Sequence, residues 1–549
     1  MKDKLCEITF QPLGLKVKVP ENTTILKAAE INNLPLEGMC NGRGTCGKCL
    51  VQASGMLTEP QLEEKERLEG KLSEGWRLAC QAKVLGNVEI RLPDKQEFRT
   101  IAKGKIKQYE FDPVIKVSSE QAYGIAVDIG TTSIVASLID LSSDGKEVAV
   151  ASCLNPQTQF GADVITRITY AHGSADNVIK LKELVLGGIN ELISKVCKEK
   201  DIQPKEIYHI TVAANNTMLH LLVGVDPFSL AVAPYNPVFV DYREYQASEL
   251  GIAAPNAVVS LLPSLSAFVG ADILAGVIAI DFHKLTEPAL FIDIGTNGEI
   301  VANVNGKLAA TSSAAGPALE GMNIHCGCRA EDGAVSSVQI EKSGQIKIKT
   351  IGSAKIKGIC GSGLVELVAE LVESGVILPS GRFAQSDDLP AFLAQRMIEH
   401  DGQPAFLIDA DSKTMLTQKD VRQVQLAKAA IAAAVDILFQ RLEIELSSVK
   451  KIYIAGAFGY HLKKEALETI GLLPAGLNVQ QVEFVGNTAK EGARLCMVSR
   501  AAADEIIVLQ KALVSLELSY APEFMDNYVS QMNFPNIPKS KQEEKIGIS

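Results

Sequence analysis

The sequence predicts an α/β multidomain protein in which a small β-rich unit precedes a larger, internally duplicated α/β unit. The 549 residues exceed what one hydrophobic core organises, since about 150 residues per domain is the usual size. Short alternating apolar runs surround a cysteine-rich loop within residues 1–94. From residue 121 onward apolar strands alternate with helical patterns, and an Asp-Ile-Gly-Thr turn occurs twice, 165 residues apart. Such repetition indicates an internal duplication.

Composition excludes several classes of function. With 47% hydrophobic and 22% charged residues the chain is typical of a well-packed globular protein. A net charge of −11 argues against nucleic acid as a partner, because phosphate-backbone binding needs clustered basic residues. No apolar stretch reaches the roughly 20 residues that cross a bilayer, and the first residues lack a signal peptide's apolar block. We therefore expect a cytoplasmic protein without a membrane partner, in which the eleven cysteines serve metal or redox chemistry rather than disulfides.

Changes of pattern along the chain predict the domain boundaries. The segments we expect are a β-rich domain at 1–94, a polar linker at 95–120, a middle domain at 121–205, a larger α/β domain at 206–538 and a disordered polar tail at 539–549.

Local patterns predict individual elements within these segments. In the first domain they predict a hairpin of residues 7–10 and 15–19, a helix capped at Thr23 and Thr24 that runs to Asn32, and strands at 47–53 and 80–84. Further along they predict helices over 177–199, 266–280 and 420–446, and a strand with its turn at 451–459.

The cysteine loop carries the strongest functional signal. Cys40, Cys46 and Cys49 follow a C-x5-C-x2-C spacing, and Cys80 lies further on in the segment LACQ. Four thiolates are the protein ligands of a [2Fe–2S] cluster, and the glycines between them let the backbone wrap closely around it. The spacing resembles a one-residue-longer variant of the plant-type ferredoxin loop, so a β-grasp ferredoxin-like domain is expected. A structural zinc site is the alternative, but a second C-x2-C pair, usual in zinc sites, is missing.

The two Asp-Ile-Gly-Thr turns have the composition of phosphate-binding hairpins. Small and hydroxyl side chains admit phosphate oxygens, backbone N–H groups donate to them, and the aspartate holds Mg²⁺ directly or through water. The first turn offers Asp128, Gly130, Thr131 and Thr132, and the second offers Asp293, Gly295, Thr296 and Asn297. Tight hairpins without a ligand are the alternative, although a carboxylate at the end of an apolar strand is costly without a partner. Which turn holds which phosphate stays open.

A third glycine turn completes the pattern. Gly456 and Gly459 follow the strand KIYIA, and together with the paired turns they resemble the actin–hexokinase–Hsp70 superfamily. That resemblance implies two ribonuclease-H-like lobes that hold ATP and Mg²⁺ between them, with adenosine at the third turn. For a base or a water-orienting group the segment ITVAANNTM offers Asn215, Asn216 and Thr217, of which Asn216 is the candidate; these residues could equally cap the next helix. A P-loop is excluded, because no G-x4-G-K-[ST] segment occurs.

Over nearly its whole length the chain resembles the reductive activators of corrinoid-dependent methyltransferases. The motifs that carry the resemblance are CNGRGTCGKC with LACQ, GIAVDIGTTSIVA, FIDIGTNGEIV, GPALEGMNIHCG, GICGSGL, IAGAFG and MNFP. The resemblance implies ATP-dependent transfer of one electron from the [2Fe–2S] cluster to a corrinoid protein, which reduces Co(II) to Co(I) in a methyltransferase or O-demethylase system. It also implies a low-potential electron donor, not identified by the sequence, and a homodimer formed through residues 121–205.

Two other functions remain open at this level. One is an ATP-driven electron injector for a different low-potential enzyme, and the other is a phosphotransferase or sensor ATPase with a regulatory ferredoxin domain. Cys326 and Cys328 depart from the single cysteine expected beside GPALEG, and a second redox role for them is also open.

Overall fold

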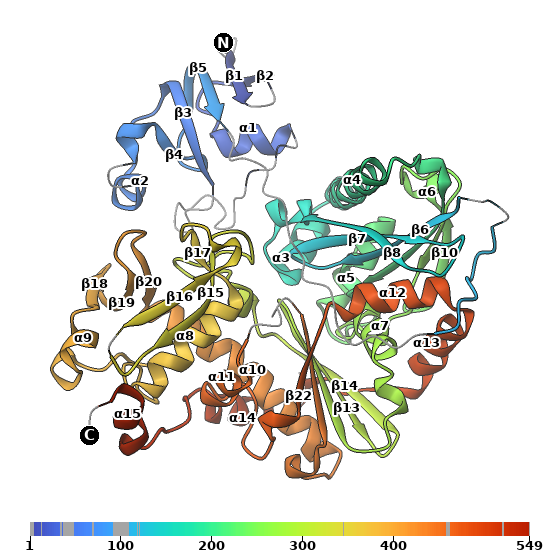
Figure 1. Ribbon diagram of the computed structural model, residues 1–549. Helices are drawn as coiled ribbons and strands as arrows, with labels where there is room; N and C mark the ends of the chain where they lie inside the picture. The colour runs from blue at the N-terminus through green and yellow to red at the C-terminus, as the bar shows by residue number, and fades with distance from the viewer. Residues whose placement is uncertain are drawn as a thin grey trace. The chain divides into compact units, whose positions relative to one another are not determined.

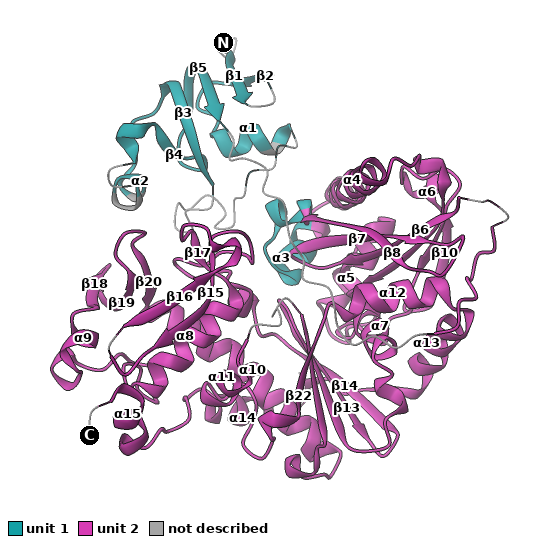
Figure 2. Ribbon diagram, in the orientation of Figure 1, with its two compact units in different colours: residues 1–97, 156–170 teal, residues 98–155, 171–549 magenta. Residues whose placement is uncertain are grey.

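The computed structural model describes residues 5–11, 14–32, 34, 36, 49–68, 71–91, 109–117, 119, 121–343, 345–456, 462–518 and 521–547. The chain divides into two compact units, one of residues 1–97 with 156–170 and the other of residues 98–155 with 171–549 (Figure 2). Each is described by itself.

The first unit contains the β-grasp domain. Its described strands form one sheet in the order β2-β1-β5-β3-β4, with β1 antiparallel to β2 and parallel to β5 (Figure 1). The element bounds are β1 Leu5–Gln11, β2 Leu15–Pro20, α1 Ile25–Ile31, β3 Leu50–Leu57, α2 Leu62–Arg67, β4 Trp76–Leu78 and β5 Val84–Arg91. The predicted hairpin and first helix are confirmed. The strand predicted at 80–84 is wrong, because residues 79–81 form a turn and the alternation that builds β5 begins at Val84.

The second unit contains two sheets of the same topology. In the first, β6, β7 and β8 form an antiparallel meander, and β9 and β11 add to it in parallel with β6. In the second, β12, β13 and β14 repeat the meander, and β21 and β22 repeat the parallel additions. This equivalence confirms the duplicated ribonuclease-H-like architecture. The first sheet extends past the boundary expected at residue 205, because β9 and β11 belong to it.

The strands of these two sheets have the following bounds: β6 Tyr123–Ile129, β7 Ser133–Asp140, β8 Glu147–Leu154, β9 Ile207–Ala214, β10 Arg243–Gln246, β11 Val258–Leu261, β12 Ala289–Ile294, β13 Gly298–Val304, β14 Lys307–Ser313, β21 Lys451–Gly456, β22 Val482–Gly486 and β23 Val514–Ser515. Two smaller sheets lie between β14 and β21 in sequence, built from β15 Ala334–Ile340, β16 Ile346–Thr350 and β17 Gly358–Ile359, and from β18 Met397–His400, β19 Gln403–Asp409 and β20 Thr414–Thr417.

The helices begin and end at clear local signals. Helix α4 starts after Ser174, whose side chain accepts from Asn177 N, and α10 starts with a Thr417–Asp420 capping box. Among the described residues no helix combines the length and apolarity needed to cross a membrane. The bounds are α3 Val164–His172, α4 Ala175–Lys200, α5 Asn216–Val223, α6 Ala247–Leu250, α7 Ala271–Ala279, α8 Gly361–Glu373, α9 Ala391–Ala394, α10 Gln418–Arg441, α11 Lys464–Thr469, α12 Thr488–Val498, α13 Arg500–Ala512, α14 Phe524–Ser530 and α15 Lys539–Ile546.

The C-terminal tail is helical, so the disorder expected over 539–549 is wrong for its described residues. Helix α15 buries Ile546 against the large core of the unit. Lys545 lies 3.0 Å from Glu370 and 2.9 Å from Glu373, both on α8. The tail is polar overall, so its composition does not reveal that Ile546 and Lys545 hold the helix in place.

Candidate functional site

The two aspartate turns have the same local structure. Asp128 is the penultimate residue of β6, Asp293 is the penultimate residue of β12, and in each case an antiparallel strand follows directly. Gly130 N donates to Ser133 O and Gly295 N donates to Asn297 O, both at 2.9 Å. Each turn therefore places a carboxylate at a strand end beside a tightly closed hydroxyl-bearing loop.

Both turns line one cavity of about 240 Å³. The predicted residues that the structure brings together there are Asp128, Gly130, Thr131, Thr132, Asp293, Gly295, Thr296, Asn297 and Gly456. The hydroxyl oxygens of Thr132 and Thr296 lie 3.4 Å apart, although 164 residues separate them in sequence. The paired arrangement expected from the duplicated turns is therefore present.

Carboxylates dominate the electrostatics of this cavity. Among its described lining residues the acidic ones are Asp128, Asp272, Asp293, Glu299 and Glu320. They lie deep in the protein, although the aspartates keep partial access to solvent through the cavity. Burial raises the pKa of Asp128 to about 6, that of Asp272 to about 7 and that of Asp293 to about 8.

Mutual repulsion adds to the effect of burial. The pKa of Asp293 is raised further by Asp272, Asp128 and Glu320. After burial, Asp272 and Asp293 also raise the pKa of Glu299. Such crowding of negative charge is what a bound cation relieves, and carboxylate oxygens are the ligands that Mg²⁺ prefers. The donor set of the cavity therefore fits Mg²⁺ carried by a nucleotide.

Asp128 is held by a residue that comes from the second sheet. Asn487 follows β22 and caps α12 by accepting from Lys490 N, and its Nδ2 donates to Asp128 Oδ2 at 2.7 Å. Burial raises the pKa of Asp128, while this hydrogen bond and the Lys490 charge lower it. Lys490 is 2% exposed and ion-paired with Glu147, which also accepts from Ser137 Oγ at 2.6 Å. The residue at the start of α12 therefore holds the Asp128 carboxylate of the first main sheet in place.

Asn216 does not reach the cavity. Its buried Nδ2 donates to Ser266 O at 3.0 Å, and its neighbour Asn215 lines the cavity instead. Asn215 Nδ2 donates to Thr131 Oγ1 at 3.2 Å, while its Oδ1 accepts from Met218 N and caps α5. The capping alternative is therefore confirmed for Asn215, which also donates to Thr131 of the first aspartate turn.

The third glycine turn is described in part. Gly456 ends β21 with φ of 108°, and a Cβ there would lie 2.2 Å from Ile294 O, so only glycine allows β21 and β12 to approach this closely beside the cavity. Phe484 and Gly486 of β22 line the same region. Gly459 lies outside the described residues.

The structure brings two of the predicted cluster ligands to the same end of the first unit's sheet. Cys49 directly precedes β3 and Cys80 follows β4, and Ala79 N donates to Cys49 O at 2.9 Å. Both cysteines are buried. Cys40 and Cys46 lie outside the described residues. Two thiols at the same end of the sheet form a donor set that fits two of the four ligands of a [2Fe–2S] cluster.

Cys326 and Cys328 lie on a segment that pairs with β17. Gly327 bridges Ile359 in parallel, Cys328 N donates to Ile359 O at 2.9 Å, and Ile359 N donates to Cys326 O at 2.8 Å. Cys326 packs against the large core. These contacts give the segment a structural role.

Sequence reasoning missed several residues of the cavity. Glu299 and Glu320 belong to the segments FIDIGTNGEIV and GPALEG, which were noted without assigning the acidic residue a role. Asp272 lies in the first turn of α7, and Asn487 follows β22. The useful signal was a polar residue directly after a buried strand or at a helix start, which is where ligands bind in α/β sheets.

Comparison with known proteins gives full-length matches. Three family models match: a "2Fe-2S iron-sulfur cluster binding domain" over residues 8–85, the "RACo middle region" over 123–285 and the "C-terminal domain of RACo the ASKHA domain" over 287–544. The corrinoid activation enzyme RamQ of Eubacterium limosum is 30% identical over 605 residues, which cover 96% of this chain and 99% of that protein.

Two further relatives agree with these matches. The [Co(II) methylated amine-specific corrinoid protein] reductase of Methanosarcina barkeri is 25% identical over 451 residues, covering 75% of this chain and 77% of that protein. A solved structure described as a reductive activator for corrinoid, iron-sulfur protein is 30% identical and covers 97% of this chain and 98% of its own, with a TM-score of 0.74.

Proposed function

This chain belongs to the family of reductive activators of corrinoid proteins, and we propose that it uses ATP to return a partner's corrinoid from Co(II) to Co(I) by passing on one electron. The observation that carries the ATP part is the cavity lined by both phosphate turns and by Asp128, Asp272 and Asp293. A corrinoid that works as Co(I) leaves the methyl-transfer cycle when it is oxidised, so its reduction restores a methyltransferase or O-demethylase system. The partner is thus a corrinoid protein in its Co(II) state.

In this proposal the first unit is the electron carrier. Cys40, Cys46, Cys49 and Cys80 would hold the [2Fe–2S] cluster, which supplies one-electron storage. Burial of Cys49 and Cys80 keeps water from these two ligands, and the backbone contact between Ala79 and Cys49 holds their segments together. A separate low-potential electron donor would reduce the cluster again after each transfer.

The second unit would bind Mg-ATP between its two sheets. Asp128 and Asp293 would hold Mg²⁺, which is supported by their position near strand ends at the cavity and by raised pKa values that a cation would lower. The hydroxyls of Thr131, Thr132 and Thr296 would contact phosphate oxygens. Adenosine would lie toward Gly456, where the backbones approach closely.

Asp272 is the better candidate for the group that orients or deprotonates the attacking water. It lines the cavity at the start of α7, and burial followed by the charge of Asp128 raises its pKa to about 7. A carboxylate with a pKa near the working pH can accept a proton and release it again. Asn215 would then hold the phosphate turn through Thr131.

ATP would supply the driving force by changing how tightly the protein binds its corrinoid partner. Moving one electron against 100 mV costs about 2.3 kcal/mol, which an ordinary cluster cannot provide from its own potential. A nucleotide shifts such an equilibrium only if it binds two conformations with different affinity. Because the cavity is lined by turns from both sheets, closing on Mg-ATP and opening after hydrolysis would change how the sheets lie relative to each other.

The test uses the purified, chemically reduced full chain with a Co(II) corrinoid protein. We expect the Co(I) absorption spectrum to appear with Mg-ATP and to stay absent with a non-hydrolysable analogue. Asp293→Asn is expected to abolish the ATP effect while the cluster spectrum stays unchanged. ATP turnover that is independent of every corrinoid protein, with phosphate transferred to a small molecule, would instead indicate a phosphotransferase. Reduction of a different low-potential enzyme would indicate another electron injector.

We also propose a homodimer through residues 121–205, as expected for the family. Light scattering at micromolar concentration should give twice the 58.8 kDa mass of the chain. A mass equal to one chain at all concentrations would overturn this proposal.

A further inference from the structure

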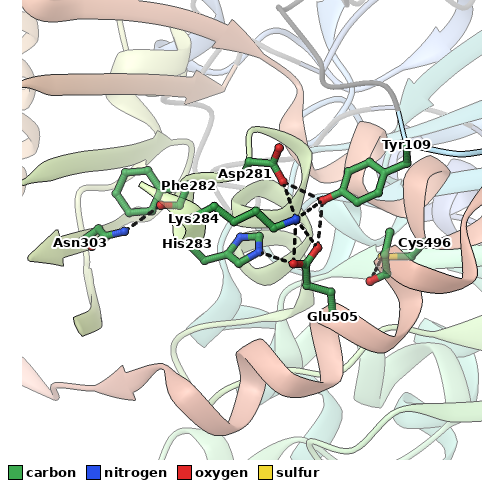
Figure 3. A network of polar contacts seen from close by, with 9 residues as sticks. Tyr109, Asp281, Phe282, His283, Lys284, Asn303, Cys496 and Glu505 are labelled. Carbon is green, nitrogen blue, oxygen red and sulfur yellow. Dashed lines mark hydrogen bonds and ion pairs between the residues drawn. The ribbon is translucent and has the colours of Figure 1, made fainter. Parts of the chain in front are cut away.

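A polar cluster outside the nucleotide cavity holds the chain that leads from the ferredoxin domain into the ATPase unit (Figure 3). Tyr109 is the first described residue after 92–108. Its hydroxyl lies 2.8 Å from Asp281 Oδ1 and 3.1 Å from Glu505 Oε2, so its proton is donated to one carboxylate or the other. Lys284 Nζ lies within 3.0 Å of both acids and 5.2 Å from the centre of the Tyr109 ring.

The protein itself supplies a cation to this cluster, the Lys284 ammonium. His283 Nε2 lies 2.9 Å from Glu505 Oε1, and Asp281, His283 and Glu505 together have the composition of a metal site. The Lys284 ammonium, however, pairs with both acids and compensates one of their two negative charges. The cluster is therefore an anchor for the Tyr109 hydroxyl.

The same segment continues along the junction of α12 and α13. Asp112 N donates to Val498 O at 3.0 Å, and Val114 N donates to Met497 O at 3.1 Å. In return Arg500 N donates to Asp112 O at 2.8 Å, and its Nη2 donates to Val114 O at 2.9 Å. Residues 109–114 are thus tied to the end of α12 and to α13 at several points.

Helices α7 and α12 both run from the nucleotide cavity to the segment of residues 109–114, with α7 ending at the Tyr109 cluster and α12 ending at residues 112–114. Helix α7 carries Asp272 of the cavity in its first turn, and Asp281 of the anchor follows its last turn. Helix α12 begins after Asn487, which lines the cavity and bonds Asp128, and its last carbonyls hold residues 112–114. Two helices therefore connect the same two places.

Close packing makes these helices one rigid pair. A Cβ on Gly492 of α12 would lie 2.0 Å from Ala275 O of α7, and a Cβ on Gly276 would lie 2.8 Å from Thr488 Oγ1. Backbones this close cannot slide past each other without a clash, because packed interiors have little free volume. A displacement at the cavity end is then carried to the anchor end.

We propose that Tyr109 is a positioning residue for electron transfer, which ties the chain from the ferredoxin domain to the far ends of α7 and α12, so that nucleotide-dependent movement of these helices moves that chain. This inference rests on the proposed function, since it says how the nucleotide would influence the electron carrier. Contiguous packed and hydrogen-bonded elements with two arrangements are the physical route that coupling between sites requires.

The direct test is Tyr109→Phe in the full chain, with hydrogen exchange at the amides of Asp112 and Val114 as the first readout. In the wild type we expect Mg-ATP to change the exchange of both amides. The variant loses a hydrogen bond to charged acceptors, so exchange should rise about tenfold and should no longer respond to Mg-ATP. ATP turnover should stay within about twofold of the wild type, because no contact at the cavity is changed.

The functional readout is the rate of Co(II) reduction with and without ATP. We expect Tyr109→Phe to lower the ATP-dependent rate by about tenfold, as the anchor opens. Arg500→Ala, which removes the bond to Val114 O from a half-exposed side chain, should act in the same direction. Tyr528→Phe is the control: Tyr528 lies on α14, which packs against α10 and not against this anchor, and loss of its hydroxyl should leave both readouts unchanged.

The outcomes separate this inference from the proposed function. Unchanged exchange in the wild type on adding Mg-ATP, or a Tyr109→Phe variant with normal exchange and normal ATP-dependent reduction, overturns the role of Tyr109 and leaves the proposed function standing. A parallel loss of ATP turnover in the variant also overturns it, because Tyr109 would then support the ATPase fold. If the wild type fails to reduce any corrinoid protein, the proposed function fails, and the exchange experiment still decides whether the anchor responds to nucleotide.

Discussion

The side-chain amide of Asn487 donates a hydrogen bond of 2.7 Å to Asp128 across 359 residues of sequence. Asn487 follows β22, an edge strand of the second main sheet, and Asp128 is the penultimate residue of β6 in the first main sheet. One hydrogen bond therefore joins the two main sheets at the wall of the cavity and helps to maintain its shape.

Asn487→Ala should weaken nucleotide binding more than it weakens the fold. The change removes a hydrogen bond to a charged acceptor, so we expect KM for Mg-ATP to rise about tenfold. Steady-state ATP turnover measures this. Asn478→Ala is the matched control, because Asn478 caps a short helix away from the cavity by accepting from Gln480 N. An equal rise of KM in both variants would contradict a specific role for Asn487.

The ion pair of Lys490 and Glu147 should be costly to break on one side only. Lys490 is 2% exposed but the Glu147 side chain is 30% exposed, so Lys490→Met leaves a partly solvated Glu147 without its cation, at a cost of about 1 kcal/mol in the free energy of unfolding. Adding Glu147→Met should restore most of that loss, because the double variant no longer holds an unpaired charge. Urea unfolding of the two single variants and the double variant checks this, and strictly additive losses would show that the pair is uncoupled.

The nucleotide-free protein should lose stability as pH rises from about 5 to 8. In the folded chain the pKa of Asp272 is about 7 and that of Asp293 about 8, whereas an unfolded aspartate has a pKa near 3.9. Groups with a raised folded pKa stabilise the fold in their protonated form, and this contribution is lost as pH passes through the folded pKa. Chemical denaturation across this pH range measures the slope.

Mg-ATP and a neutral substitution should both flatten that slope. A bound cation lowers the pKa of the carboxylates, and Asp293→Asn removes one titrating group without changing its shape. A slope that is equal in the wild type and in Asp293→Asn would show that the cavity carboxylates are not its source.

Cys49→Ser and Cys80→Ser should each remove the visible absorption of the cluster and leave ATP turnover in place. The two thiols belong to the first unit, and the cavity proposed for the nucleotide is lined by residues of the second. Cys6→Ala is the control, since Cys6 is equally buried in the same unit but lies on β1. Iron and acid-labile sulfide assays measure the cluster content, and a full cluster in Cys80→Ser would contradict the ligand assignment.

Local sequence patterns were sufficient to predict short segments whose residue composition indicates their chemistry. The two aspartate turns and the cysteine loop are short segments whose composition alone indicates their chemistry, and nine residues of the predicted nucleotide site do line one cavity. Asp272 and Asn487 were missed because their role depends on where α7 and α12 begin in space, which no spacing in the sequence encodes.

Three other differences between the sequence-based prediction and the structure also have physical reasons. The sequence does not distinguish Asn216 from Asn215, because adjacent side chains at a helix start have equivalent patterns until the cap is known, and the cap is Asn215. The boundary expected at 205 separated β9 from the sheet that it completes, because a parallel strand joins its sheet only after a long connection. The tail was expected to be disordered because burial of one side chain, Ile546, does not change its overall composition.

The ratio of ATP hydrolysed to Co(I) formed, followed in one reaction of the reduced protein with a Co(II) corrinoid protein, decides whether the two processes are coupled. We expect Co(I) to accumulate only while ATP is consumed, at a fixed ratio, and Asp293→Asn and Cys49→Ser each to stop Co(I) formation. Co(I) formed at the same rate and to the same extent without nucleotide would contradict this coupling.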